Sequence, residues 1–424
     1  DMVHPYLRRK QGREAITYPS EAIKEVLERT LGVPIFQEQV IRLAMVAAGF
    51  SGGEADALRR AIAAWGRDSK LLTFEQQLTR GMIARGYNAD FARRLFDQIK
   101  GFAGYGFPES HSASFALIAW VSAWLKRHHP AAFFTGLLNS QPMGFYSPSQ
   151  LIQDARRHGV VVLPVDVHHS QWDHQLLDTP QAQGQPPLRL GLRLVRGLSR
   201  EGAQRVMEAR RHQPVRQISN LRRQARLDKR DTEALADADA LQSLSGHRHQ
   251  AQWQIMALEQ PKPLLHDEQC RNARYFDDGV QLPPPGVAEE VLSDYRATGL
   301  TLRAHPMSLL RDRPPFNRCK RHTDLAALGN KRFVRIAGLV TCRQRPGSAS
   351  GVLFLTLEDE TGNSNVVVWQ RTQQQFRRAL MSGQLLLVKG VVEQKDGVIH
   401  VIAGALYDYT GELATLRVQS HDFH

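Results

Sequence analysis

Residues 101–116 read GFAGYGFPESHSASFA, and the apolar segment LIAWVSAWLKRHHPAAF follows them without a break. Small, aromatic and hydroxyl residues alternate in the first stretch around a single histidine, His111. Gly104 and Gly106 allow a backbone to approach a ligand closely, and the N–H groups that begin the next helix favour an anion. The stretch is therefore typical of a ligand-facing turn before a helix. A histidine that only supports the structure is the alternative.

Apolar residues recur at helical spacing between about residues 21 and 137, which predicts an all-helical block around this turn. Gly52 and Gly53 interrupt the pattern. Arg59 and Arg60 follow this break, and two guanidinium groups near a helix start suit phosphate oxygens. A solvated helix face is the alternative interpretation of the arginine pair.

The run GYGF-x-x-SHS resembles the fingers domain of bacterial C-family DNA polymerases, the DNA polymerase III α-subunit class. The segments PESHSASFA and LLNSQPMGFYSPSQLIQDARRHGV are most similar to the error-prone branch of that family, and IFQEQVIRLAM and GFSGGEADALRRAI resemble earlier fingers helices. The turn AWGRDSK departs from the lysine-rich turn of replicative relatives. The resemblance, together with the residue types, implies a nucleotide pocket bounded by Arg59, Arg60, Lys70, Tyr105, Ser110 and His111.

A second kind of pattern begins at Arg332, where apolar residues alternate with polar ones. Five short strands, a helix-like insert and glycine turns predict a five-stranded OB barrel. Such barrels bind single strands through basic grooves and stacked aromatic rings. The candidate DNA contacts are Trp369, Arg371 and Lys389, with Phe354 and Tyr407 as further possibilities, although Phe354 also suits the core.

Between these regions, residues 191–210 read GLRLVRGLSREGAQRVMEAR, the form of a helix, a tight glycine turn and a second helix. A helix-hairpin-helix presents N–H groups to a DNA phosphate without reading bases. A generic pair of helices is the alternative, and residues 241–253 form a weaker second candidate. The DNA-binding residues predicted in the hairpin are Arg196, Gly197, Arg200, Gly202 and Arg205.

The composition favours a polyanionic partner. The 424 residues carry 55 Lys and Arg against 42 Asp and Glu, a net charge of +13, with a pI near 9.9 and a mean hydropathy of −0.38. An arginine-preferring genome is the alternative explanation. Cys270, Cys319 and Cys342 are too scattered for a disulfide framework or a zinc site. No apolar run approaches the ~20 residues that cross a bilayer, so we expect a cytoplasmic protein without membrane contact.

Nucleotidyl transfer on two Mg²⁺ ions needs paired carboxylates, which in this family belong to a palm domain that precedes the fingers. No Asp-x-Asp strand precedes residue 21, and we interpret the other acidic clusters as solvated surface. The sequence therefore predicts no catalytic residue and no metal ligand within this chain, with Mg²⁺ held elsewhere in the complete enzyme. The acidic residues considered are Asp237, Asp239, Asp277, Asp278, Glu358, Asp359 and Glu360.

Together these patterns predict a multidomain chain, mostly α-helical and ending in a small all-β OB barrel. The resemblance implies a fragment of an error-prone DNA-directed DNA polymerase acting in translesion synthesis, cut at its N-terminus. Its implied partners are primer–template DNA, single-stranded DNA, dNTP, Y-family-like and RecA-like accessory proteins and, through them, the sliding clamp. A stand-alone DNA-binding protein is the alternative. The expected regions are fingers-like 1–160, helix-hairpin-helix 161–260, linker 261–325, OB-fold 326–415 and tail 416–424.

Overall fold

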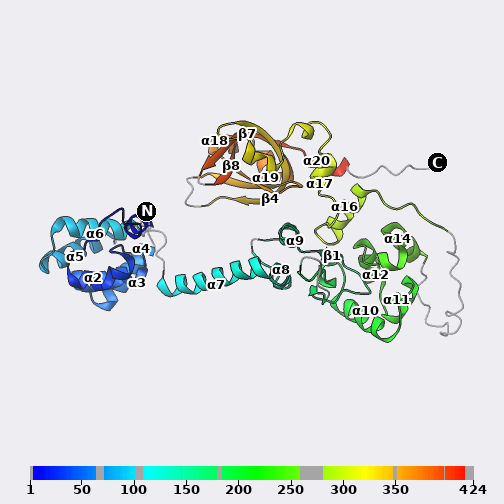
Figure 1. Ribbon diagram of the computed structural model, residues 1–424, viewed down its shortest axis with the longest axis horizontal. Helices are drawn as coiled ribbons and strands as arrows, with labels where there is room; N and C mark the ends of the chain where they lie inside the picture. Colours follow the sequence, from blue (N-terminus) through cyan, green and yellow to red (C-terminus); the bar gives the residue numbers. More distant parts are fainter. Residues whose placement is uncertain are drawn as a thin grey trace. The chain divides into compact units, whose positions relative to one another are not determined.

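The computed structural model describes residues 3–63, 71–101, 108–144, 146–178, 184–257, 280–346, 351–395 and 397–415. By its internal contacts the chain divides into two compact units, Asp1–Leu125 and Lys126–His424. The described part of the first unit is helical, and the second combines helices with a closed barrel (Figure 1). The predicted fold class is therefore confirmed. Of the helices in the described ranges, none has both the length and the apolarity to cross a membrane.

The first unit packs amphipathic helices around a core in which Leu43, Leu58, Leu78 and Phe96 are almost fully buried. Helix α5 crosses α3 at Gly81. This position needs glycine, because a Cβ there would collide with the carbonyl oxygen of Ala48. The last helix, α7, runs on into the second unit. The helices are α1 (Val3–Lys10), α2 (Glu21–Leu27), α3 (Gln37–Ala48), α4 (Gly52–Ala63), α5 (Leu71–Ala84), α6 (Ala89–Gly101) and α7 (Glu109–His128).

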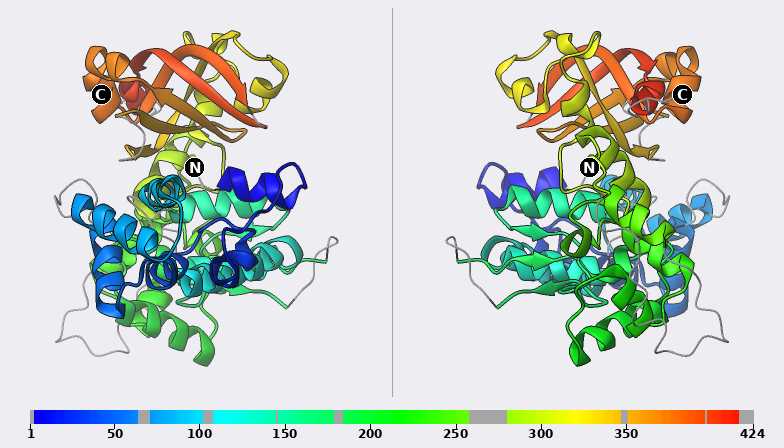
Figure 2. Two further views of the ribbon diagram at one scale, coloured as in Figure 1. Left: turned by 90° about the vertical axis from the view of Figure 1, so that its left-hand side faces the viewer. Right: turned by 90° about the vertical axis from the view of Figure 1, so that its right-hand side faces the viewer.

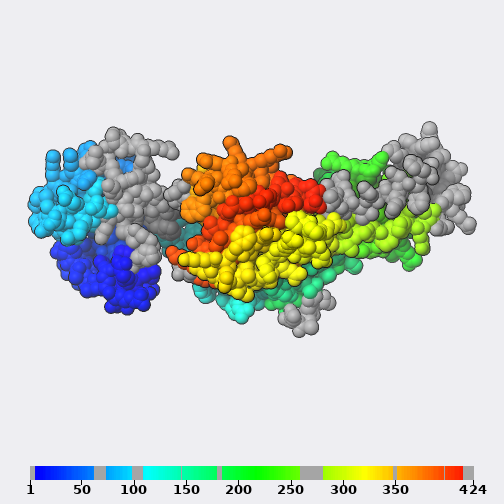
Figure 3. Space-filling view, turned by 90° about the horizontal axis from the view of Figure 1, so that it is seen from above, coloured from blue at the N-terminus to red at the C-terminus, as the bar shows by residue number. Residues whose placement is uncertain are grey.

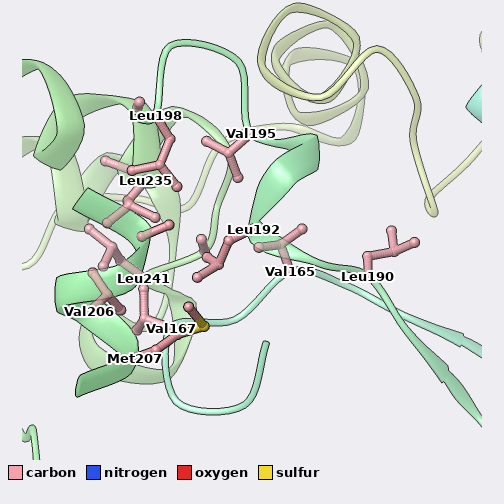
Figure 4. Packing of buried hydrophobic residues seen from close by; sticks show 14 of the residues in the cluster. Val165, Val167, Leu190, Leu192, Val195, Leu198, Val206, Met207, Leu235 and Leu241 are labelled. Atoms are coloured by element: carbon pink, nitrogen blue, oxygen red, sulfur yellow. The ribbon is translucent and has the colours of Figure 1, made fainter. Parts of the chain in front are cut away.

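The second unit opens with α8 (Pro130–Asn139) and α9 (Pro148–Arg157), which share one core with residues up to Leu300. The boundary predicted at residue 160 groups both helices with the fingers-like block, whereas their buried side chains pack against the hairpin region. Figure 4 shows part of this core, with Leu198 and Leu235 close together. Its other elements are β1 (Val162–Leu163), β2 (Gln175–Leu176), β3 (Leu188–Arg189), η2 (Leu192–Leu194), α10 (Arg200–His212), α11 (Ile218–Gln224), α12 (Lys229–Asp237), α13 (Gln242–Ser245) and α14 (Arg248–Met256).

Two helices, α16 (Val287–Ala297) and α17 (Pro306–Leu310), lead into a barrel of strand order β4-β5-β6-β8-β7. All strand pairs are antiparallel except β6 with β8, the order of an OB-fold. Figure 2 shows the closed strands, and Figure 3 shows the orange and red surface of the barrel as one continuous mass. The strands and later helices are β4 (Phe333–Gln344), β5 (Leu353–Glu358), β6 (Asn363–Val368), α18 (Gln370–Gln375), α19 (Arg377–Ser382), β7 (Leu385–Lys395), β8 (Val398–Asp408) and α20 (Thr410–Thr415).

Candidate nucleic-acid interface

The predicted arginine pair of the fingers-like region lies on α4 and shares one carboxylate. Arg59 Nε lies 2.9 Å from Asp56 Oδ1, and Arg60 Nη2 lies 3.3 Å from Asp56 Oδ2. Both guanidinium groups remain partly exposed, Arg60 more than Arg59. Exposed pairs of this kind contribute little to stability, so an incoming phosphate could replace Asp56 at small cost.

The start of α7 holds the other predicted nucleotide-facing residues. Ser110 and His111 are exposed in its first turn, and the His111 ring packs at a tilt against Phe115 with centroids 4.3 Å apart. The Glu38 carboxylate accepts the N–H of Glu109 at 2.9 Å, so an acidic group already occupies this helix N-terminus. Sequence reasoning missed Glu38 because it lies on α3, 71 residues away. Lys70 and Tyr105 lie outside the described residues.

The first hairpin, residues 195–199, joins η2 to α10 and is closed by internal hydrogen bonds. Gly197 has φ +86°, the left-handed conformation that glycine tolerates. Ser199 caps α10 by accepting the N–H of Gly202 at 2.9 Å. Asp231, which is buried, accepts the backbone N–H and the hydroxyl of Ser199 at 2.8 and 2.7 Å. A Cβ on Gly202 would collide with this carboxylate, so the glycine serves close packing here.

The arginines predicted to bind DNA at this hairpin all contact protein groups. Arg196 donates its guanidinium to the carbonyls of Tyr295 and Arg296, both at 3.3 Å, at the end of α16. Arg205 donates Nε to the carbonyl of Ala225 at 2.8 Å. Arg200 lies over the Trp172 ring, 5.8 Å from its centroid. The DNA-binding roles of these residues stay predictions, but each side chain also has a structural contact.

A second hairpin, residues 225–228, joins α11 to α12 and was missed by sequence reasoning. Its N-cap Asp228 accepts the N–H of Asp231 at 2.7 Å, as Ser199 does for Gly202 in the first hairpin. Arg226 occupies the left-handed position with φ +46°, where the first hairpin has Gly197. The correspondence of RGLSREGA with ARLDKRDT is the sequence signal that could have revealed it. The weaker candidate, 241–253, falls on α13 and α14 instead.

The barrel separates its predicted contacts into two places. Trp369 is the exposed N-cap of α18, and Arg371 is exposed in the first turn of that helix. On the adjoining strands, Lys389 Nζ lies 4.8 Å from the ring centroid of Tyr407. Phe354 alternates with core leucines on β5 and is half-buried, so it lies on the outer face. Cations beside aromatic rings are the groups that hold single strands in such barrels.

Several acidic residues that we interpreted as solvated surface are buried instead, and that interpretation is wrong for them. Asp239 binds Arg303 Nη2 at 2.6 Å with 9% of its side chain exposed. Glu358 lies 3.4 Å from His305, and Asp359 caps a turn by accepting the N–H groups of Thr361 and Gly362. The sequence around each of these carboxylates reads as a polar turn. It does not reveal that Arg303, His305 and Arg311 will pack against them in the folded chain.

Glu360 pairs with Arg311, which directly follows α17, whereas Asp237 pairs with Gln252 inside the hairpin region. Glu360 accepts both Nε and Nη2 of Arg311, at 2.8 and 2.7 Å. Burial, the largest single influence, opposes ionisation there, but the Arg311 hydrogen bond, a backbone hydrogen bond and the charges of Arg311 and Arg321 together lower the pKa of Glu360. Asp237 accepts Gln252 Nε2 at 2.9 Å, and Asp277 and Asp278 lie outside the described residues. Within the described ranges, no three His, Cys, Asp or Glu side chains gather as a metal site.

Comparison with known proteins places these regions. A family model for the bacterial DNA polymerase III alpha subunit finger domain matches residues 1–86, one for a helix-hairpin-helix motif matches 159–251, and one for an OB-fold nucleic acid binding domain matches 334–409. Over its whole length the chain is 55% identical to the error-prone DNA polymerases of Teredinibacter turnerae and Saccharophagus degradans, and 53% identical to that of Idiomarina loihiensis.

Over its whole length the chain is similar to one part of the error-prone DNA polymerases. The resemblance to the error-prone branch is thus confirmed, and the chain spans 41%, 41% and 40% of the length of these three relatives. Both hairpins fall within the helix-hairpin-helix match, and Trp369, Arg371 and Lys389 fall within the OB-fold match. Ser110 and His111 lie beyond the finger-domain match.

Proposed function

We propose that this chain supplies the nucleotide-facing fingers and the DNA-holding regions of an error-prone DNA-directed DNA polymerase. The observation that carries the proposal is the identity of 55% with error-prone DNA polymerases over the entire chain. The helix-hairpin-helix and OB-fold matches support DNA as the ligand, and the net charge of +13 supports binding through phosphates.

In this proposal the chemistry of nucleotidyl transfer, with its Mg²⁺ ions, belongs to residues outside this chain. Support comes from the carboxylates described above, since Asp239, Asp359 and Glu360 each hold a protein group. The chain's own residues would orient the triphosphate through Arg59, Arg60, Lys70, Tyr105, Ser110 and His111.

The proposed ligands are primer–template DNA along the helix-hairpin-helix region, a single strand at the barrel and a dNTP at the fingers. The exposed Trp369 and the Lys389–Tyr407 pair support the single-strand assignment. The Y-family-like and RecA-like accessory proteins, and the sliding clamp reached through them, are proposed from the resemblance to the error-prone branch.

The test measures binding of this chain to a fluorescent primer–template between 50 and 300 mM salt, and then primer extension with Mg²⁺ and dNTPs. We expect tight binding whose logarithm falls linearly with log salt, by about 0.9 per phosphate neutralised, and no extension. A flat salt response would refute phosphate binding. Robust extension would refute the assignment of catalysis to other residues. In a parallel titration with a fluorescent dNTP, binding of DNA without any binding of dNTP would favour the stand-alone DNA-binding alternative.

A further inference from the structure

The two hairpins of the second unit differ in what surrounds their cations. In the first hairpin, both the side chain and the backbone of Arg196 bind the end of α16. The guanidinium donates to the carbonyls of Tyr295 and Arg296, and the backbone N–H donates to the carbonyl of Ala297 at 2.8 Å. Leu300, just beyond, belongs to the same buried core. The first hairpin is therefore docked against the protein's own chain.

The second hairpin carries a dense positive surface. Between residues 222 and 230 the sequence RRQARLDKR places five cations and one carboxylate. Arg223, Arg226, Lys229 and Arg230 are all exposed, in contrast to the buried anchors Leu221 and Leu227. This alternation turns the apolar residues into the core and leaves the cations on one connected turn.

Three of these cations have no protein partner within the described part of the chain. Lys229 lies 3.7 Å from Glu233, and Asp228 faces its own helix by accepting the N–H of Asp231. The side chains of Arg223, Arg226 and Arg230 make no hydrogen bond, ion pair or ring contact with any described residue. These exposed positive charges repel one another, and no carboxylate of the described residues compensates them. An anionic ligand that binds there removes this repulsion and is therefore favoured.

The backbone conformation of Arg226 also indicates a functional site at the second hairpin. Its φ of +46° is a left-handed conformation that costs a non-glycine residue about 1 kcal/mol or more, and the equivalent position of the first hairpin is glycine. A cation kept at a hairpin tip where glycine fits better is a conformational outlier, and such outliers concentrate at functional sites.

We propose that the second hairpin, through Arg223, Arg226 and Arg230, is the main contact of this unit with the DNA phosphate backbone, while the first hairpin chiefly holds α16. This rests on the proposed function. The three guanidinium groups come from the end of α11, the turn and the start of α12, so they can contact successive phosphates. They meet backbone oxygens and not bases, which makes the contact independent of sequence.

The experiment compares two triple variants of the full chain in the primer–template binding assay. R223Q/R226G/R230Q removes the hairpin cations and places glycine at the left-handed position, which keeps the turn. R42Q/R93Q/R94Q is the matched control, since it removes three exposed arginines of the first unit that also lack partners among the described residues. Circular dichroism verifies that both variants keep their helical content.

We expect the hairpin variant to bind at least about tenfold more weakly at 150 mM salt, with a salt slope smaller by about 2 to 3, and the control to bind within about threefold of the unchanged chain. Equal losses in both triple variants, or no loss in the hairpin variant, would overturn the inference while leaving the proposed function intact. Failure of the unchanged chain to bind DNA would instead refute the proposed function.

Discussion

The first and second hairpins of the second unit have similar backbones and different surroundings. Each ends in a capped helix, with Ser199 or Asp228 as the N-cap, and each has a left-handed residue before a buried leucine. In the first hairpin the exposed Arg196 binds the end of α16, whereas the exposed Arg223, Arg226 and Arg230 of the second hairpin have no side-chain partner among the described residues. The difference teaches that a motif predicts local geometry, but the elements packed against it decide which copy remains available to a ligand.

The largest expected effect comes from Asp231, the buried residue that joins the two hairpins. Asp231→Ala leaves the backbone N–H and the hydroxyl of Ser199 without their acceptor, at about 2 kcal/mol for each group. We therefore expect the free energy of unfolding of the second unit to fall by about 4 kcal/mol in urea unfolding. Hydrogen exchange should increase in peptides that cover α10.

Asp228→Ala is the matched control for this change. It removes an exposed N-cap with one hydrogen bond and should cost about 1 kcal/mol. Gly202→Ala should also destabilise the unit because its Cβ meets Asp231, and the double variant G202A/D231A should cost less than the sum of the two. If the two aspartate variants lost equal stability, the described asymmetry of the hairpins would be incorrect.

A second prediction concerns the pH dependence of stability near the first hairpin, where a buried histidine accepts a backbone hydrogen bond. His174 accepts the N–H of Gly191, just before the first hairpin, at 3.1 Å. Burial, aided by the Arg193 charge, lowers the pKa of His174 from 6.5 to about 4. The unfolded chain therefore binds more protons between these values, so stability is full above about pH 6.5 and falls as the pH drops toward 4. The full loss amounts to about 3 kcal/mol.

His174→Asn is the control variant, because its Oδ1 can replace Nδ1 as the acceptor for Gly191 and cannot be protonated. Urea unfolding of this variant should lose about 3 kcal/mol less than the unchanged chain between pH 7 and pH 4. Identical pH profiles for both proteins would show that His174 is not the titrating group. Carboxylates would then govern unfolding at acidic pH.

The smallest expected effect has the opposite sign. Arg226→Gly relieves the left-handed backbone, and after the extra entropy that glycine gains in the unfolded chain we expect stabilisation of about 0.5 kcal/mol. The same change should weaken DNA binding, which separates the ligand role of this residue from any structural role. Destabilisation together with unchanged DNA affinity would assign Arg226 to the fold instead.

Much of the fold could be predicted from periodicity. The alternation after Arg332 predicts the barrel, because strands with one buried face repeat every second residue, and the structure closes them in OB order. Helical spacing likewise predicts the first unit. Sequence alone did not predict that α8 and α9 pack with the hairpin region, since an amphipathic helix does not specify which neighbour covers its apolar face.

The candidate sites divide in the same way. By itself the sequence determined the similarity to error-prone DNA polymerases, the basic character and the place of the first hairpin, because glycine turns, charges and long motifs are local properties. Only the tertiary structure decided that Arg196 binds α16, that Asp239 and Asp359 are buried, and that Arg223, Arg226 and Arg230 remain exposed without protein partners in the described chain. Partners distant in sequence set those outcomes, and burial and pairing arise only when the chain has folded.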